Sequence, residues 1–147
     1  MTPNPELRTT EQVPLEMAKE ILDAMEEQSE TIGLQSVMAV TDAEGNFIAQ
    51  RRMDNAWLPS VNISLNKAYT AAGFEMATED LAEVTIPGES LWGLQVTDES
   101  RLVVFGGGIP LEHDGAVVGA VGSSGGEVSQ DVEVAEAGVE RFDELVE

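Results

Sequence analysis

The sequence predicts an α+β domain in which an antiparallel sheet of about five strands is flanked by helices. Three observations lead to this prediction. Two long segments with helical apolar spacing lie near the ends of the chain, and short apolar segments with turn residues lie between them. The segments do not alternate in the βαβ order of a parallel sheet. The length of 147 residues and an apolar fraction of 42% suit one domain with its own core.

The chain opens with a predicted flexible lead-in, residues 1–12, which contains prolines and shows no apolar period. We expect a single folded domain over residues 13–147. A first helix is predicted from about Pro14 to Ile32, because apolar residues recur on one face and acidic residues cover the others. Proline suits its first turn, and Gly33 suits its C-terminal stop.

A hairpin and a helix pair are predicted in the middle of the chain. The hairpin consists of a strand at 36–41, a turn at 42–45 and a partner strand at 46–53. A helix is expected at about 60–76, after a proline. A short helical turn is expected at 78–83.

Strands return in the second half of the chain. The continuous apolar run 102–105 is typical of a strand buried on both faces, and apolar residues resume at 109–111 after three glycines. Asp114-Gly115 predicts a hairpin turn into a second buried strand at 116–121. The last helix is expected to begin near Ser129, with one apolar stripe and one acidic face.

The charge balance restricts the classes of partner. Acidic residues number 28 against 7 basic ones, which gives a formal net charge of −21. Because nucleic acids and anionic lipids bind through clustered Lys and Arg, we expect neither as a partner. The carboxylates are spread among apolar segments and therefore predict an acidic shell on a folded domain. An acidic, lysine-poor surface is typical of a salt-adapted (halophilic) organism, the alternative being an acidic mesophilic protein.

Two residue types restrict the chemistry. The absence of cysteine excludes disulfides, thiolate nucleophiles and Cys-ligated metals. The single histidine, His113, is predicted in a mobile hairpin turn, which makes it a poor general base, alone or in a triad with Ser123 or Ser124. No apolar run approaches the ~18 residues of a membrane span, and the first residues carry no signal-like segment. We expect a cytoplasmic protein.

Four motifs carry a resemblance to a known family. They are Arg52-Met53-Asp54, Asn66-Lys67-Ala68-Tyr69-Thr70-Ala71-Ala72, Phe105-Gly106-Gly107-Gly108-Ile109-Pro110-Leu111, and Gly119 to Gly126 continuing to Gln130-Asp131. In this order and spacing, the segment of roughly residues 13–141 resembles the GlcG/HbpS family, which includes the C-terminal domain of PduO proteins.

The resemblance implies a profilin-like fold, assembly into a homo-oligomer, and binding of haem or a corrinoid-related ligand. It leaves the function open between a small-ligand-binding protein, an enzyme acting on haem or on a small 2-hydroxy acid, and a structural, sensory or corrinoid-related accessory protein. The first helix of this chain carries no histidine. We therefore do not expect histidine-ligated haem.

We expect the ligand pocket between the glycine segments and the helix that carries Lys67. The residues Gly106–Gly108 form either an anion-binding concavity of exposed N–H groups or a bulge that bends the sheet. Residues 122–126 either help to bind a carboxylate or phosphate at the N-terminus of the last helix, or they form a tight strand-to-helix connection that Ser129 caps. The predicted ligand-binding residues are Lys67, Tyr69, Thr70, Phe105, Gly106, Gly107, Gly108, Ser123, Ser124, Gly125 and Asp131.

Lys67 lies in a small, nearly uncharged stretch, which predicts an inward side chain with Asp131 as its partner. Two roles stay open, an ion pair that joins two helices and an ammonium that faces an anionic ligand. Tyr69 is expected to be a core aromatic with a satisfied hydroxyl rather than an axial ligand. Trp57 and Trp92 fall in loop-like contexts and favour a surface that is covered in a homo-oligomer.

Overall fold

A four-stranded antiparallel sheet of order β2-β1-β4-β3 forms the centre of the fold. The strands are β1 (Val37–Asp42), β2 (Phe47–Arg52), β3 (Gly108–His113) and β4 (Ala116–Ser124). The computed structural model describes residues 2–147. The central strands β1 and β4 pair so that Val37 lies opposite Ser124 and Asp42 lies opposite Gly119.

The sheet has four strands, so the prediction of about five was wrong. The apolar run 102–105 forms no strand, because it lies against α2 (Ser60–Phe74) and not in the sheet. The N–H of Val103 donates to Thr70 Oγ1 at 3.0 Å. Gly107 then turns the chain with a left-handed φ of 127°, and β3 begins one residue later. An apolar run alone does not distinguish a strand from a segment that packs on a helix.

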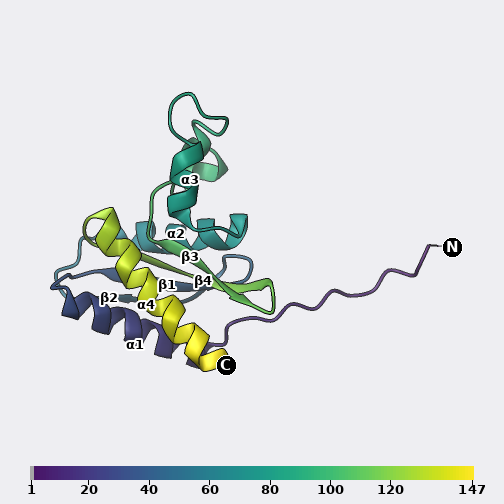
Figure 1. Ribbon diagram of the computed structural model, residues 1–147, viewed down its shortest axis with the longest axis horizontal. Coiled ribbons are helices and arrows are strands. Elements are labelled where there is room, and N and C mark those ends of the chain that lie inside the picture. The colour runs from purple at the N-terminus through teal and green to yellow at the C-terminus, as the bar shows by residue number, and fades with distance from the viewer. Residues whose placement is uncertain (1) are drawn as a thin grey trace.

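Helices cover both faces of the sheet (Figure 1). The two long helices α1 (Leu15–Thr31) and α4 (Val128–Val146) lie side by side on one face, and α2 lies on the other. The core between the sheet and the pair α1/α4 consists of large side chains, among them Ile21, Met25, Met38, Val121 and Phe142. This layer contains most of the buried apolar side chains that stabilise the domain.

The layer between α2 and the sheet consists of small residues. Ala68, Ala71 and Ala72 of α2 pack on Ala120 of β4. A Cβ atom on Gly122 would overlap the backbone carbonyl oxygen of Ser64. The backbone of α2 therefore lies directly on β4, and this close approach fixes where the side chains of α2 reach beyond the end of the strand.

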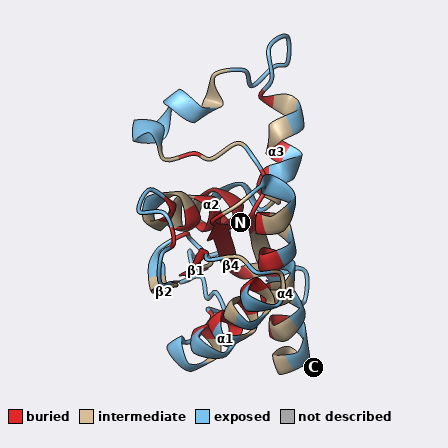
Figure 2. Ribbon diagram, turned by 90° about the vertical axis from the view of Figure 1, so that its left-hand side faces the viewer, coloured by how far each residue is buried: buried red, intermediate tan, exposed pale blue. Residues whose placement is uncertain are grey.

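A segment that we call the arm, residues 86–101, projects above α2 (Figures 1 and 2). It follows α3 (Thr78–Val84) and contains two short 3-10 turns, Leu94–Val96 and Asp98–Ser100. None of its residues is buried. The arm therefore has no hydrophobic core of its own.

The predicted helices agree with the structure to within about two residues at each end. The cap of the last helix differs from the expected one. Its N-cap is Glu127, which forms a capping box with Gln130, so the expected cap at Ser129 was wrong. No helix among residues 2–147 has both the length and the apolar composition to cross a bilayer.

Candidate functional site

A buried ion pair between α2 and α4 lies at the centre of the candidate site. Lys67 Nζ lies 3.0 Å from Asp131 Oδ2, and the two side chains are 0% and 4% exposed. The ammonium also donates to the backbone oxygen of Ser123 at 2.8 Å. The predicted partnership of Lys67 with Asp131 is thus confirmed.

Aromatic and backbone groups complete the surroundings of the pair. Lys67 Nζ lies 5.0 Å from the ring centre of Phe105, a cation–π contact, and the N–H of Gly126 donates to Asp131 Oδ1 at 3.2 Å. Burial lowers the pKa of Lys67 and raises the pKa of Asp131, and the attraction between the two charges opposes both shifts. Ser123 Oγ is buried near the pair and has no hydrogen-bond partner.

The glycines at 106–108 are required by close packing around Lys67. A Cβ on Gly107 would lie 2.6 Å from Lys67 Nζ, and a Cβ on Gly108 would overlap the backbone oxygen of Lys67. Two N–H groups of the glycine segments have partners within the protein, since Gly108 donates to Thr78 Oγ1 at 3.0 Å and Ser123 donates to Gly107 O at 2.9 Å. These two N–H groups are not free to bind an anion.

A surface cleft of about 480 Å³ borders the ion pair. Its apolar walls are formed by Trp57, Leu58, Pro59, Ile63, Phe105 and Val128. Its polar floor is formed by Ser60, Ser124 and Asp131, where the hydroxyl oxygens of the two serines lie 3.0 Å apart in a hydrogen bond. Such a combination of apolar walls and a few convergent polar groups is typical of small-molecule sites. We call this feature the cleft.

The structure brings part of the predicted site together at the cleft. Phe105, Ser124 and Asp131 line it, while Lys67 and Ser123 lie directly behind Asp131. Gly106 packs on Val128 and Val132 of α4, and Gly125 packs on Gln35 and Ser36.

Tyr69 and Thr70 face the arm. The Tyr69 hydroxyl donates to Asp98, and the guanidinium of Arg101 stacks 3.6 Å from the Tyr69 ring centre. The hydrogen bond to Asp98 raises the pKa of Tyr69. Thr70 accepts the N–H of Val103. Both side chains therefore hold the base of the arm, and Tyr69 is half-buried, not a core aromatic.

Several residues that line the cleft were not among the predicted ligand-binding residues. Ser60 and Ile63 lie seven and four residues before Lys67 on α2, so one helical face carries them all. That spacing was a usable signal. Trp57 was noted only for its exposure, and nothing in the sequence placed it on the same cleft as Phe105.

The residues of the cleft do not fit histidine-ligated haem. Among the described lining residues there is no His, Cys, Met or Tyr, the side chains that hold haem iron. His113 lies at the far end of β3, beside Glu11 with its Nδ1 3.3 Å from Glu11 Oε1. The apolar walls do fit the faces of a flat apolar ligand.

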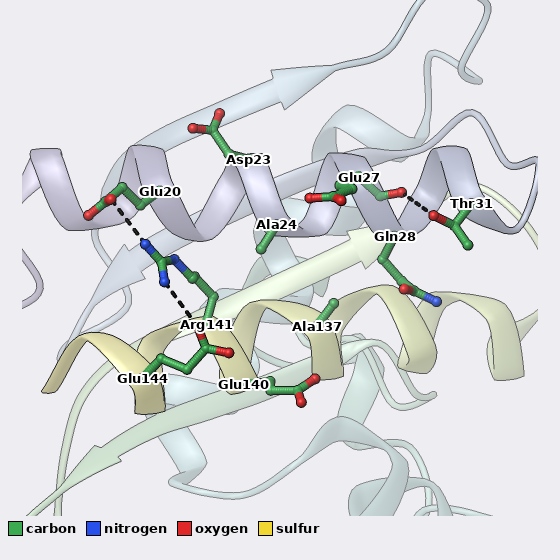
Figure 3. A pocket seen from close by; sticks show the side chains of 10 residues that line it. All are labelled: Glu20, Asp23, Ala24, Glu27, Gln28, Thr31, Ala137, Glu140, Arg141 and Glu144. Carbon is green, nitrogen blue, oxygen red and sulfur yellow. Dashed lines mark hydrogen bonds and ion pairs between the residues drawn. The ribbon is translucent and has the colours of Figure 1, made fainter. Parts of the chain in front are cut away.

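A second hollow of about 440 Å³ lies between α1 and α4 (Figure 3). Arg141 crosses it with hydrogen bonds to Glu20 at 3.2 Å and to Glu144 at 2.9 Å. Asp23, Glu27 and Glu140 supply further carboxylates. This acidic and polar lining disfavours both apolar and anionic ligands, so the cleft is the better candidate.

Comparison with known proteins shows the family of the chain. A family model described as haem degrading protein HbpS-like matches residues 13–140. A protein of 15.0 kDa from the dhaT-dhaS intergenic region of Citrobacter freundii is 44% identical over 133 residues, which cover 90% of this chain and 94% of that protein.

Two crystal structures are also similar. Klebsiella pneumoniae protein ORFY superposes with a TM-score of 0.94 at 35% identity, covering 97% of this chain and 98% of that chain. A PduOC:heme complex superposes with a TM-score of 0.85 at 32% identity, covering 88% of this chain and 94% of that chain.

Proposed function

The chain belongs to the HbpS-like family, and on that premise we propose that it binds a flat, largely apolar ligand of the tetrapyrrole class, haem or a corrinoid relative, in the cleft. One observation carries the proposal: the aromatic side chains of Trp57 and Phe105 form walls around a small polar floor next to a buried ion pair. A relative of 32% identity is described as a complex with heme. We further propose a cytoplasmic, salt-adapted homo-oligomer.

The ligand is held by contact with its faces and by polar contacts at one edge. The helices α2 and α4 both begin at the cleft, at Ser60 and Val128. The dipole at a helix N-terminus favours carboxylates, such as propionates. The N–H groups of Ser60 and Val61 already donate to Trp57 O and Leu58 O, and Glu127 caps α4, so this attraction comes from the dipoles and not from free donors. Side-chain ligation of a central metal is not part of the proposal, because the described lining residues offer no ligand of that kind.

We propose binding and not catalysis. Among the described lining residues, Asp131 is the one titratable side chain. Its Oδ2 is paired with Lys67 and its Oδ1 accepts the N–H of Gly126. A general acid or base needs a proton that it can exchange with the ligand, and this carboxylate is held by internal partners.

Parallel titrations with haemin and with metal-free protoporphyrin IX in molar KCl test the proposal. Because no side chain ligates the metal, the two dissociation constants should agree within about threefold. Trp57→Ala should weaken both by about tenfold, since an aromatic contact contributes 0.5–1.5 kcal/mol beyond its buried area. Phe47→Ala is the matched control, because Phe47 is 58% exposed at the opposite end of the sheet.

Three results would overturn the proposal. The first is tight binding of haemin with no binding of the metal-free porphyrin. The second is an unchanged affinity in Trp57→Ala. The third is loss of binding in His113→Ala, which would place the ligand at the far end of β3.

A further inference from the structure

We infer that the arm of one copy closes the cleft of a second copy, so that the ligand site is complete only in the oligomer. The arm and the cleft are two apolar surfaces that the single chain leaves open. The role of the arm in ligand binding rests on the function proposed above, whereas the contact between the two copies does not depend on it.

The arm presents apolar side chains that its own chain leaves partly or largely exposed. Ile86, Leu91, Trp92 and Val96 are between 41% and 72% exposed. No residue from 86 to 101 is buried, although ordering each residue costs about 1–2 kcal/mol of backbone entropy. The arm stands clear of the sheet and of α4 (Figure 2). A segment of this kind needs an apolar surface to cover it.

The cleft presents the complementary surface. Its wall residues Trp57, Leu58, Phe105 and Val128 are between 43% and 68% exposed. The cleft is a hollow and the arm is a protrusion, and both surfaces carry exposed apolar side chains.

The arm does not reach the cleft of its own chain. Its base is tethered to α2 at the hydroxyl of Tyr69, which donates to Asp98, and at Thr70, which accepts the N–H of Val103. Arg101 stacks on the ring of Tyr69. These contacts hold the arm upright above α2.

The area of the two surfaces favours a second copy as the occupant. Each exposed apolar side chain of the arm and the cleft offers on the order of 100 Å², so together they offer roughly 800 Å² per copy. That is the area per partner of a standard stable interface. Both surfaces belong to the same chain, so the arm of each copy covers the cleft of the other in an isologous pair.

The absence of cysteine makes the contact directly measurable. Glu89 on the arm and Glu127 beside the cleft are both exposed. Glu89→Cys and Glu127→Cys are prepared as separate proteins, mixed in molar KCl and treated with a short bismaleimide. We expect cross-linked dimers in the mixture and few with either variant alone. Glu144→Cys, at the far end of α4, replaces Glu127→Cys in the control mixture and should give few dimers.

The two tryptophans give a second readout, since one lies on each surface. In Trp57→Phe and in Trp92→Phe, the remaining indole should shift its emission to longer wavelength when dilution dissociates the oligomer. Emission that is independent of concentration, together with a mass of 15.7 kDa in molar KCl, would overturn the inference. So would cross-linking confined to single chains of the Glu89→Cys/Glu127→Cys double variant, because the arm would then close its own cleft.

The ligand titration separates this inference from the proposed function. Trp92→Ser should shift the protein toward monomer and weaken protoporphyrin IX binding by about tenfold, because the ligand loses one wall of its site. Loss of assembly with unchanged affinity would overturn the composite site. Cross-linking of the wild-type surfaces without any porphyrin binding would refute the proposed function and leave the contact between copies established.

Discussion

Replacing Lys67 with methionine removes the positive charge of the buried ion pair and keeps an unbranched side chain that is one atom shorter. In the wild type, Asp131 Oδ2 lies 3.0 Å from Lys67 Nζ, and both side chains are almost fully buried. The variant leaves Asp131 with backbone donors such as the N–H of Gly126. An uncompensated buried charge costs about 3–5 kcal/mol, which for a domain of this size lowers Tm by roughly 10 °C or more.

The assay is thermal unfolding followed by circular dichroism at constant KCl, with a double-mutant cycle. Lys67→Met, Asp131→Asn and the double variant are compared with the wild type. The double variant should recover most of the loss, because a neutral pair leaves no unpaired charge. Porphyrin affinity of folded Lys67→Met should be unchanged, since Asp131 and Phe105 separate the ammonium from the cleft. An unchanged Tm with weakened binding would refute this reasoning and support an ammonium that faces the ligand.

The pH dependence of the same variant gives an independent check. Burial raises the pKa of Asp131 above its ordinary value of 3.8, and the Lys67 ammonium opposes this rise. Without the ammonium the pKa rises further. A carboxyl whose folded pKa is raised contributes stability below its unfolded pKa and loses it as pH rises through the folded pKa. The Tm deficit of Lys67→Met should therefore shrink from pH 7 toward pH 5, and a constant deficit would contradict the burial of an unpaired Asp131.

Three further predictions concern the surface charge, the unpaired Ser123 hydroxyl and the contact between α2 and β4. With a net charge of −21, Tm should rise with KCl as the Debye length falls from about 10 Å at 0.1 M to about 3 Å at 1 M, and a flat curve would remove the salt-adapted interpretation. Ser123→Ala should leave stability unchanged or raise it by up to about 1 kcal/mol in urea unfolding, because Ser123 Oγ has no partner; a clear loss would indicate an unseen one. Gly122→Ala should cost about 3 kcal/mol, because its Cβ overlaps Ser64, whereas the control Gly73→Ala, with no atom within 4 Å, should be neutral or stabilising; equal effects would contradict the close approach of α2.

The sequence predicted those parts of the fold that depend on local periodicity. The amphipathic helices at both ends and the hairpin of β1 and β2 lie close to their predicted positions. The run 102–105 was misassigned because it pairs with no strand: the N–H of Val103 donates to Thr70 of α2, and Phe105 lines the cleft. The packing partner of an apolar run depends on the tertiary fold, and the local sequence pattern does not identify it.

The candidate site was predicted in part for a similar reason. The pairing of Lys67 with Asp131 followed from chemistry, because a lysine among small uncharged residues needs a buried partner. Tyr69 and Thr70 lie next to Lys67 in sequence but on other faces of α2, where they hold the arm. Trp57 lies before α2 in the sequence, and it lines the same cleft as Phe105 because α2 packs on β4 in the tertiary fold.

A crystal structure of the protein grown with protoporphyrin IX at high KCl would show directly whether the cleft is the ligand site. We expect a porphyrin between the rings of Trp57 and Phe105, with its carboxylates at the N-termini of α2 and α4. Trp92 of a second copy should lie over the outer face of the porphyrin. A porphyrin bound beside His113, or a cleft filled by side chains of its own chain, would show that the cleft is not the ligand site.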